Sequence, residues 1–133
     1  MIGIVIVAHG GLAAEYLAAV EHVVGPIEQV RAIAIAADYD KTRKAAEILE
    51  AANAVDTGDG VIVVVDMFGS SPSNLSLPAC ATSDRKILYG ANLPMLVKLA
   101  KSRERDIDSA TKAAMAAGRK YIDSIDGKPA GRQ

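Results

Sequence analysis

Two side chains able to carry out group transfer stand at the ends of apolar runs. His9, one of two histidines in the 133-residue chain, follows the run Ile2–Val7. Asp66 directly follows a second such run, Val61–Val65. A carboxylate beside an imidazole fixes the tautomer of the ring and raises its basicity, so the other ring nitrogen is free to act as a nucleophile. A fold that joins His9 and Asp66 would therefore provide a site for accepting a transferable group.

Small and polar residues follow both side chains where helical patterns begin. Gly10 and Gly11 lead from His9 into one pattern, and a serine-rich segment leads from Asp66 into another. The amide groups at a helix N-terminus favour anions, and hydroxyl and amide groups donate hydrogen bonds to phosphoryl oxygens. The candidate phosphoryl-binding residues are Gly10, Ser70, Ser71 and Asn74.

Each of these residues also has a purely structural explanation. A histidine at a strand end is more often a hydrogen-bonded structural residue than a nucleophile. Asp66 or Ser71 could cap the third helix, which for Ser71 alone is the favoured interpretation, and the glycines could supply only turn geometry. The functional interpretation depends on three loops meeting at one edge of a sheet.

The elements that would position these residues alternate along the chain. Four β-branched runs predict strands, and the first and third are continuously apolar, which is typical of parallel strands covered on both faces. The predicted strands are Ile2–Val7, Val30–Ile35, Val61–Val65 and Lys86–Tyr89. The predicted helices are Leu12–Val24, Lys41–Val55, 71–81, Pro94–Ser102 and Ile107–Ile125.

This alternation predicts an α/β fold: a three-layer, open, mostly parallel sheet flanked by helices, with strand order 2-1-3-4. The pattern leaves undecided whether the sheet has an extra strand at its edge. In that order the first and third strands are neighbours, ~4.8 Å apart. Ligands bind beyond the carboxyl ends of such strands, where the strand order reverses. His9 and Asp66 are therefore expected side by side at this edge, with the loop Gly90–Pro94 near them.

Composition limits the class of protein. The formal net charge is −1 with both signs interleaved, which leaves no electrostatic footprint for nucleic acid. No apolar run approaches the ~20 residues of a membrane span, so no membrane insertion is expected. Cys80 is the only cysteine, which favours a reducing compartment. We expect one cytoplasmic domain over residues 1–125 and a frayed polar tail over 126–133.

Three other site types fit the sequence less well. A receiver domain phosphorylated on Asp66 needs acidic residues after the first strand to hold Mg²⁺, and Ala8 and His9 supply none. A nucleotide site lacks both glycine-rich phosphate-binding motifs. A zinc site needs three protein ligands, whereas His9 and Asp66 make two.

Three motifs carry a family resemblance. The segments "IVIVAHGGLA", "VVVDMFGSSPSNLS" and "GANLPML", in that order and spacing, resemble the mannose-family IIA components of the bacterial phosphoenolpyruvate-dependent sugar phosphotransferase system. The resemblance covers the chain up to its tail. Two positions depart from the family pattern: Ser70 stands where a second glycine is usual, and Ala8 where Thr or Ser is common.

The resemblance implies a phosphoryl carrier that works without a metal or another cofactor. His9 would be phosphorylated by an HPr-type phosphocarrier or a nitrogen-branch paralogue and would pass the group to a separate IIB component. Asp66 would orient His9, and Ser71 would contact the phosphoryl group. A homodimer is also implied. The residues expected at the site rim or partner surface are Phe68, Asn92, Pro94 and Met95.

Two other roles use the same chemistry on His9. The chain could be a regulatory phosphoprotein whose state signals to a partner, or it could deliver phosphoryl groups to a dihydroxyacetone kinase. Sequence does not separate these roles from sugar transport, because the reaction at His9 is the same in each.

Overall fold

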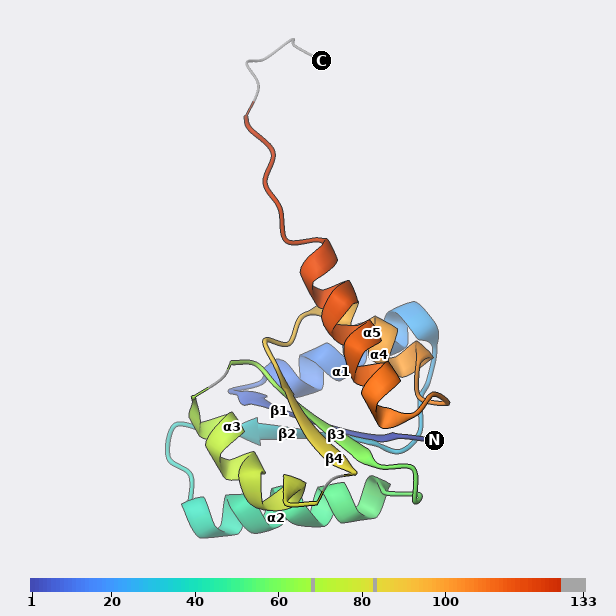
Figure 1. The fold of residues 1–133 in the computed structure, drawn as a ribbon. Helices are drawn as coiled ribbons and strands as arrows, with labels where there is room; N and C mark the ends of the chain where they lie inside the picture. The colour runs from blue at the N-terminus through green and yellow to red at the C-terminus, as the bar shows by residue number, and fades with distance from the viewer. Residues whose placement is uncertain (68, 83, 128–133) are drawn as a thin grey trace.

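The structure is a computed structural model that describes residues 1–67, 69–82 and 84–127. Strands and helices alternate along these residues (Figure 1). The strands are β1 (Gly3–His9), β2 (Val30–Ile35), β3 (Val61–Val65) and β4 (Arg85–Tyr89). The helices are α1 (Leu12–Val24), α2 (Lys41–Val55), α3 (Ser71–Ser76), α4 (Leu93–Lys101) and α5 (Ile107–Lys120), with a short 3₁₀ helix, η1 (Leu77–Cys80), after α3. None of these described helices has the length and apolar composition needed to cross a bilayer.

The sheet has the predicted α/β topology. All four strands are parallel in the order β2-β1-β3-β4, which confirms the predicted fold class and strand order. His9 pairs with Ile35 of β2, and Val7 pairs with Val65 of β3. Since parallel strands end at one edge, the segments after β2 and β3 emerge on either side of His9. The extra edge strand left open by the sequence is absent from the described residues.

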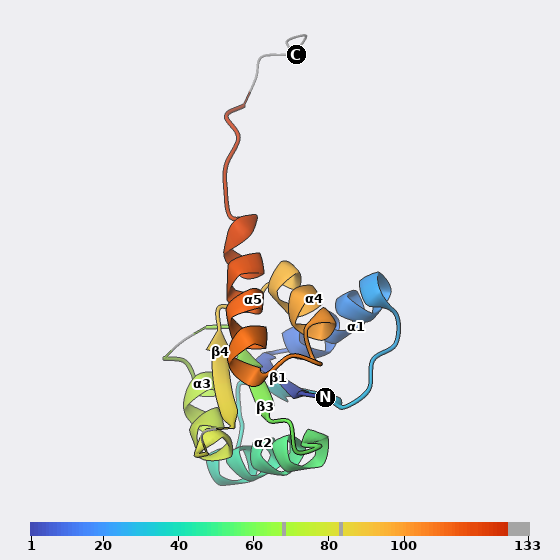
Figure 2. The ribbon, with the colours of Figure 1, turned by 45° about the vertical axis from the view of Figure 1, so that its right-hand side comes forward.

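Helices cover both faces of the sheet (Figures 1 and 2). Helices α1, α4 and α5 pack on one face, and α2, α3 and η1 pack on the other. Alternate residues of β1 point into the two cores: Ile4 and Ile6 into the first, and Val5 and Val7 into the second. A strand covered on both faces needs apolar residues at every position, which explains the unbroken runs in β1 and β3. The site edge is thus built on the two most buried strands.

The last predicted helix is too long. The sequence predicts it over Ile107–Ile125, but α5 ends at Lys120, and the chain then extends away from the body of the molecule (Figure 1). Ile122 and Ile125 prolonged the apolar pattern, yet their side chains are 75% and 91% exposed. Neither side chain belongs to the two cores of the described residues, so core packing does not stabilise a further helical turn. Of the predicted tail 126–133, residues 128–133 lie outside the described part.

The predicted helix over 71–81 is divided into two pieces. The α-helical part, α3, ends at Ser76, and η1 completes the segment to Cys80. Pro78 explains the break, because it has no amide hydrogen to donate to Asn74 and its ring collides with the carbonyl group four residues earlier. The short α3 therefore ends close to the site edge.

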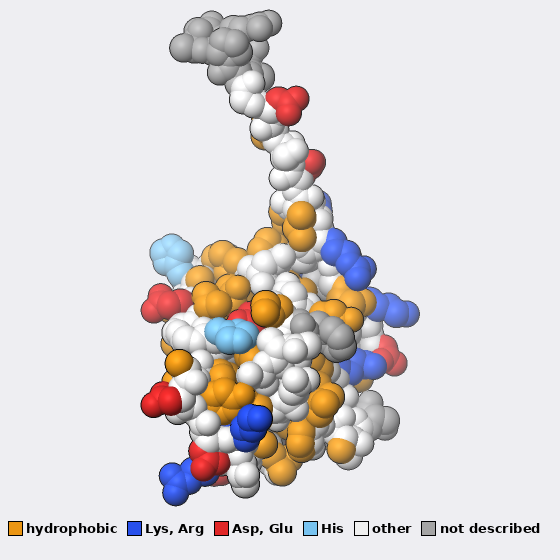
Figure 3. Space-filling view, turned by 90° about the vertical axis from the view of Figure 1, so that its left-hand side faces the viewer, with side chains coloured by type: hydrophobic (Ala, Val, Ile, Leu, Met, Phe, Trp, Pro, Cys, Tyr) orange, Lys and Arg blue, Asp and Glu red, His pale blue; other side chains and the backbone are white. Residues whose placement is uncertain are grey.

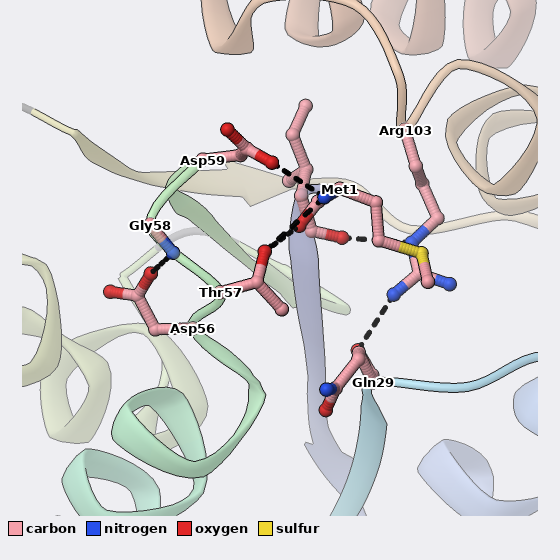
Figure 4. A network of polar contacts seen from close by, with 8 residues as sticks. Met1, Gln29, Asp56, Thr57, Gly58, Asp59 and Arg103 are labelled. Atoms are coloured by element: carbon pink, nitrogen blue, oxygen red, sulfur yellow. Dashed lines mark hydrogen bonds and ion pairs between the residues drawn. The ribbon is translucent and has the colours of Figure 1, made fainter.

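A buried arginine ties together the amino ends of the first two strands, at the opposite end of the sheet from His9 (Figure 4). Arg103 is only 5% exposed, and its Nε donates to the Ile2 carbonyl oxygen at 2.8 Å. A terminal guanidinium nitrogen donates to the Gln29 carbonyl oxygen at 2.9 Å. Sequence analysis did not identify this residue. Within the described residues, its side-chain hydrogen bonds go to backbone carbonyl groups, which indicates a role in fixing the sheet rather than in chemistry.

Candidate functional site

His9 and Asp66 lie side by side at the sheet edge, as their positions in the sequence predict. His9 is the last residue of β1, and Asp66 directly follows β3. The His9 Nδ1 atom lies 2.7 Å from the Asp66 Oδ2 atom. The His9 side chain is 46% exposed, whereas that of Asp66 is 12% exposed. The carboxylate is therefore set beneath a solvent-accessible imidazole.

The Asp66 carboxylate is held as an anion by several donors. Its Oδ2 atom accepts a hydrogen bond from the His9 amide at 3.0 Å as well as contacting the ring, and its Oδ1 atom accepts from the Met67 amide at 3.0 Å. Burial raises the pKa of Asp66, but the hydrogen bonds from the His9 amide, the His9 ring and the Met67 amide outweigh burial and hold the pKa below its usual value. An ionised carboxylate only accepts, so His9 presents Nδ1–H to it.

This pairing leaves Nε2 as the nitrogen with a lone pair. Among the described residues, no hydrogen bond to His9 Nε2 occurs. Neither Asp66 nor Ser71 is the N-cap residue of α3. That position belongs to Ser70, whose side chain makes no capping hydrogen bond. The geometry therefore supports a nucleophilic imidazole oriented through its other nitrogen.

The serine-rich segment after Asp66 gives its residues different environments. Gly69 has φ +78°, whereas Ser70 has an extended backbone at φ −92°, so the replacement of a usual glycine by Ser70 imposes no strain. The buried Ser70 hydroxyl donates to the Met67 carbonyl oxygen at 2.6 Å and closes the turn. Ser71 is half-buried and its Oγ atom accepts a hydrogen bond from the Tyr39 hydroxyl at 2.8 Å. Asn74 is exposed at the outer face of α3.

The two glycines after His9 shape the turn that leads from β1 into α1. Gly10 has φ +55°, a conformation in which a side chain is strained, and its amide donates to the Ile35 carbonyl oxygen at 3.0 Å. That amide is therefore committed to the sheet rather than free for an anion. Gly11 is the N-cap residue of α1 and offers no side-chain capping bond, so the first amide groups of α1 have no cap.

The four expected rim residues are placed differently from one another. Phe68 lies outside the described residues. Asn92 caps α4 by accepting from the Met95 amide at 3.0 Å and donates to the Gly118 carbonyl oxygen at 2.8 Å, so both ends of its amide are used internally. Met95 is 5% exposed and packs in the core under α5. Pro94 is half-buried at the start of α4.

Tyr39 is the site-edge residue that sequence analysis missed. It lies in the loop between β2 and α2, which leaves the sheet beside His9. The sequence predicts site residues on the segments that leave β1, β3 and β4, but not on the segment that leaves β2. The available signal was its position: a tyrosine shortly after a strand that must end at the same edge.

Comparisons with known proteins assign the chain to a family. The family model described as "PTS system fructose IIA component" matches residues 3–117. The mannose-specific EIIAB component of Escherichia coli K12 is 31% identical over 135 residues, which cover 96% of this chain and 41% of that protein. The chain thus spans about two fifths of the length of the curated relatives it matches.

Solved structures show the same architecture. The phosphotransferase system component EIIA from Streptococcus agalactiae superposes with a TM-score of 0.83 at 26% identity, covering 93% of this chain and 97% of that one. The mannose/sorbose-specific IIA subunit from Enterococcus faecalis gives a TM-score of 0.84 at 20% identity, with coverage of 96% and 97%, and likeness at that identity speaks for the fold alone. Together with the family match over residues 3–117, these similarities confirm the resemblance seen in the motifs: the chain belongs to the fructose/mannose IIA component family of the phosphoenolpyruvate-dependent sugar phosphotransferase system.

Proposed function

We propose that the chain is a phosphoryl carrier that works through the Nε2 atom of His9. It accepts the group in the cytoplasm from a phosphorylated HPr-type carrier, or a nitrogen-branch paralogue, and passes it to a separate IIB component for sugar uptake. The observation that carries this proposal is the 2.7 Å contact between His9 Nδ1 and Asp66 Oδ2, which supports Nε2 of the 46% exposed side chain as the attacking atom. Direct transfer between histidines uses no metal or other cofactor.

The transfer step is a displacement at phosphorus. The Nε2 lone pair forms the new P–N bond while the P–N bond of the donor breaks, and its electron pair stays on the donor's ring nitrogen. The His9 ring gains positive charge, which the Asp66 carboxylate stabilises through Nδ1–H. The Ser71 hydroxyl and the uncapped first amide groups of α1 are the candidate donors to the phosphoryl oxygens.

The donor protein would dock on an apolar surface around His9. Leu12, Met67 and Leu93 are exposed large apolar residues on the segments that leave β1, β3 and β4. Figure 3 shows apolar side chains gathered around a histidine on this face of the molecule. An apolar rim around an exposed nucleophile suits brief contact with a partner that carries its own histidine.

The proposal is tested by labelling with phosphoenolpyruvate, enzyme I and HPr. We expect one phosphoryl group per chain, labile in acid and stable in base, as for a phosphoramidate. His22→Ala is the matched control, because His22 is the other histidine and lies exposed on α1. It should label as fully as the wild type. A chain that stays unlabelled, or a label lost in His22→Ala, would contradict the proposal.

We further propose that the chain forms a homodimer through the surface beside β4 and α5. Between these elements lies a groove of about 370 Å³, and Ile87, Met115 and Ile122 are among the residues that line it. The neighbouring Ile125 is almost fully exposed, although isoleucine is rarely found so. A second copy of the chain covering this groove would bury these apolar side chains.

Light scattering should therefore give a mass near twice the 13.8 kDa of one chain. Replacing both Ile122 and Ile125 by Ser should shift the population toward the monomer, because each loses apolar contact area. Leu77→Ser is the matched control, as Leu77 is exposed on η1 in the opposite helical layer. A wild-type monomer at micromolar concentration would exclude this dimer.

A further inference from the structure

The loop after β2 places a tyrosine hydroxyl against Ser71, one of the candidate phosphoryl-binding residues. Tyr39 follows Ile35, the β2 residue that pairs with His9, and its ring packs against the core under α2. Its hydroxyl donates to Ser71 Oγ at 2.8 Å. The partly buried ring and the hydrogen bond to Ser71 together restrict the position of this hydroxyl.

Ser71 differs from the other serines of its segment. Ser70, Ser73 and Ser76 each donate their hydroxyl proton to a backbone carbonyl oxygen. The acceptors are those of Met67 (2.6 Å), Ser70 (3.0 Å) and Pro72 (2.5 Å), respectively. Ser71 instead accepts from Tyr39, and within the described residues its own proton goes to no carbonyl group. Of these four hydroxyls, the one on Ser71 is therefore free to donate to a ligand.

We propose that Tyr39 is a positioning residue that sets the Ser71 hydroxyl as a donor to the phosphoryl group in transit on His9. This inference rests on the proposed function. A phenol is a stronger donor and a weaker acceptor than an alkyl hydroxyl, because its lone pair is delocalised into the ring. Tyr39 therefore donates, and the Ser71 proton is directed to another acceptor. Hydrogen bonds in a chain polarise one another, so the bond from Tyr39 strengthens donation by Ser71 to an anionic oxygen.

Three variants test the coupling between the two hydroxyls. Tyr39→Phe keeps the ring and its packing but removes the donor, and Ser71→Ala removes the relay. We expect the rate of transfer from phosphorylated HPr to fall roughly 10²-fold in Ser71→Ala and roughly tenfold in Tyr39→Phe. The double variant should be as slow as Ser71→Ala alone, because Tyr39 has nothing left to act through.

Two further readouts separate positioning from packing. The KM for phosphorylated HPr should stay unchanged in Tyr39→Phe while kcat falls, since the bond acts on the group in transit. The phosphorus-31 resonance of the phosphorylated chain should shift in Tyr39→Phe and in Ser71→Ala. Tyr121→Phe is the matched control, because Tyr121 is exposed beyond α5. This variant should leave KM, kcat and the phosphorus-31 resonance unchanged.

The outcomes distinguish this inference from the function on which it rests. If Tyr39→Phe slows transfer by the same factor with and without Ser71, while the wild type is phosphorylated on His9, then Tyr39 acts independently of Ser71 and the inference is overturned. The same holds if the phosphorus-31 resonance does not move in a folded Tyr39→Phe chain, as judged by its thermal unfolding. A wild-type chain that takes no phosphoryl group on His9 overturns the proposed function, and this inference falls with it.

Discussion

Replacing Asp66 by Asn should slow phosphoryl transfer to His9 by roughly 10²–10⁴-fold in a chain that still folds. The variant keeps the shape of the side chain but removes the charge that stabilises the ring as the P–N bond forms. Its amide can also donate to Nδ1, which would favour the tautomer with the proton on Nε2 and block the attacking lone pair. The measurement is the single-turnover rate with phosphorylated HPr, taken beside the melting temperature.

The pH dependence of unfolding provides the control for Asp66. Folding lowers the pKa of this carboxyl, so its contribution to stability is complete above the pKa of the unfolded carboxyl and is lost as the pH falls through the folded-state pKa. The melting temperatures of the wild type and Asp66→Asn should therefore differ at neutral pH and converge in acid. Near-wild-type transfer in the folded variant would mean that Asp66 only accepts hydrogen bonds from backbone amides and does not assist the reaction at His9.

Replacing Gly3 by Ala should be the most damaging small substitution in the sheet. A Cβ atom at Gly3 would overlap the carbonyl oxygen of Val55, the last residue of α2, and would lie 2.7 Å from a methyl group of the same residue. Val55 is fully buried, so neither atom can move aside. We expect a loss of about 3 kcal/mol in the free energy of unfolding, from overpacking against backbone. The melting temperature would fall by roughly 10 °C.

Gly127→Ala is the matched control for this prediction. A Cβ atom at Gly127 meets nothing within 4 Å, and the residue needs no left-handed backbone. Its melting temperature should equal that of the wild type in the same thermal scan. An unchanged melting temperature in Gly3→Ala would show that the strand and α2 separate easily, which the close contact between Gly3 and Val55 does not allow.

The sheet could be predicted from the sequence because its signals are local and mutually consistent. Continuous apolar runs mark β1 and β3 as strands covered on both faces, and right-handed crossovers then leave few strand orders. Helix ends were harder to predict. The apolar pattern continues through Ile122 and Ile125, and only the fold shows that these side chains lie beyond the core. The helical pattern of 71–81 also runs through Pro78, which divides the segment into α3 and η1.

The candidate site was predictable where it depends on strand ends and not where it depends on side-chain partners. The order of the strands brings His9 and Asp66 together. The Gly10 amide donates to the Ile35 carbonyl oxygen, and Met95 is buried. Both features follow from tertiary packing, which the spacing of residues in the sequence does not reveal. The bond from Tyr39 to Ser71 joins positions 32 apart in the chain, and neither residue is unusual alone.

Because Asp66 holds Nδ1 of His9, we propose that Nε2 is the atom that carries the phosphoryl group. The most direct measurement is a heteronuclear spectrum of the phosphorylated chain with nitrogen-15 in its histidine rings, in which coupling to phosphorus identifies the bonded nitrogen. We expect phosphorus on Nε2 of His9, with the contact between Nδ1 and Asp66 retained. Phosphorus on Nδ1, on His22 or on Asp66 itself would contradict it.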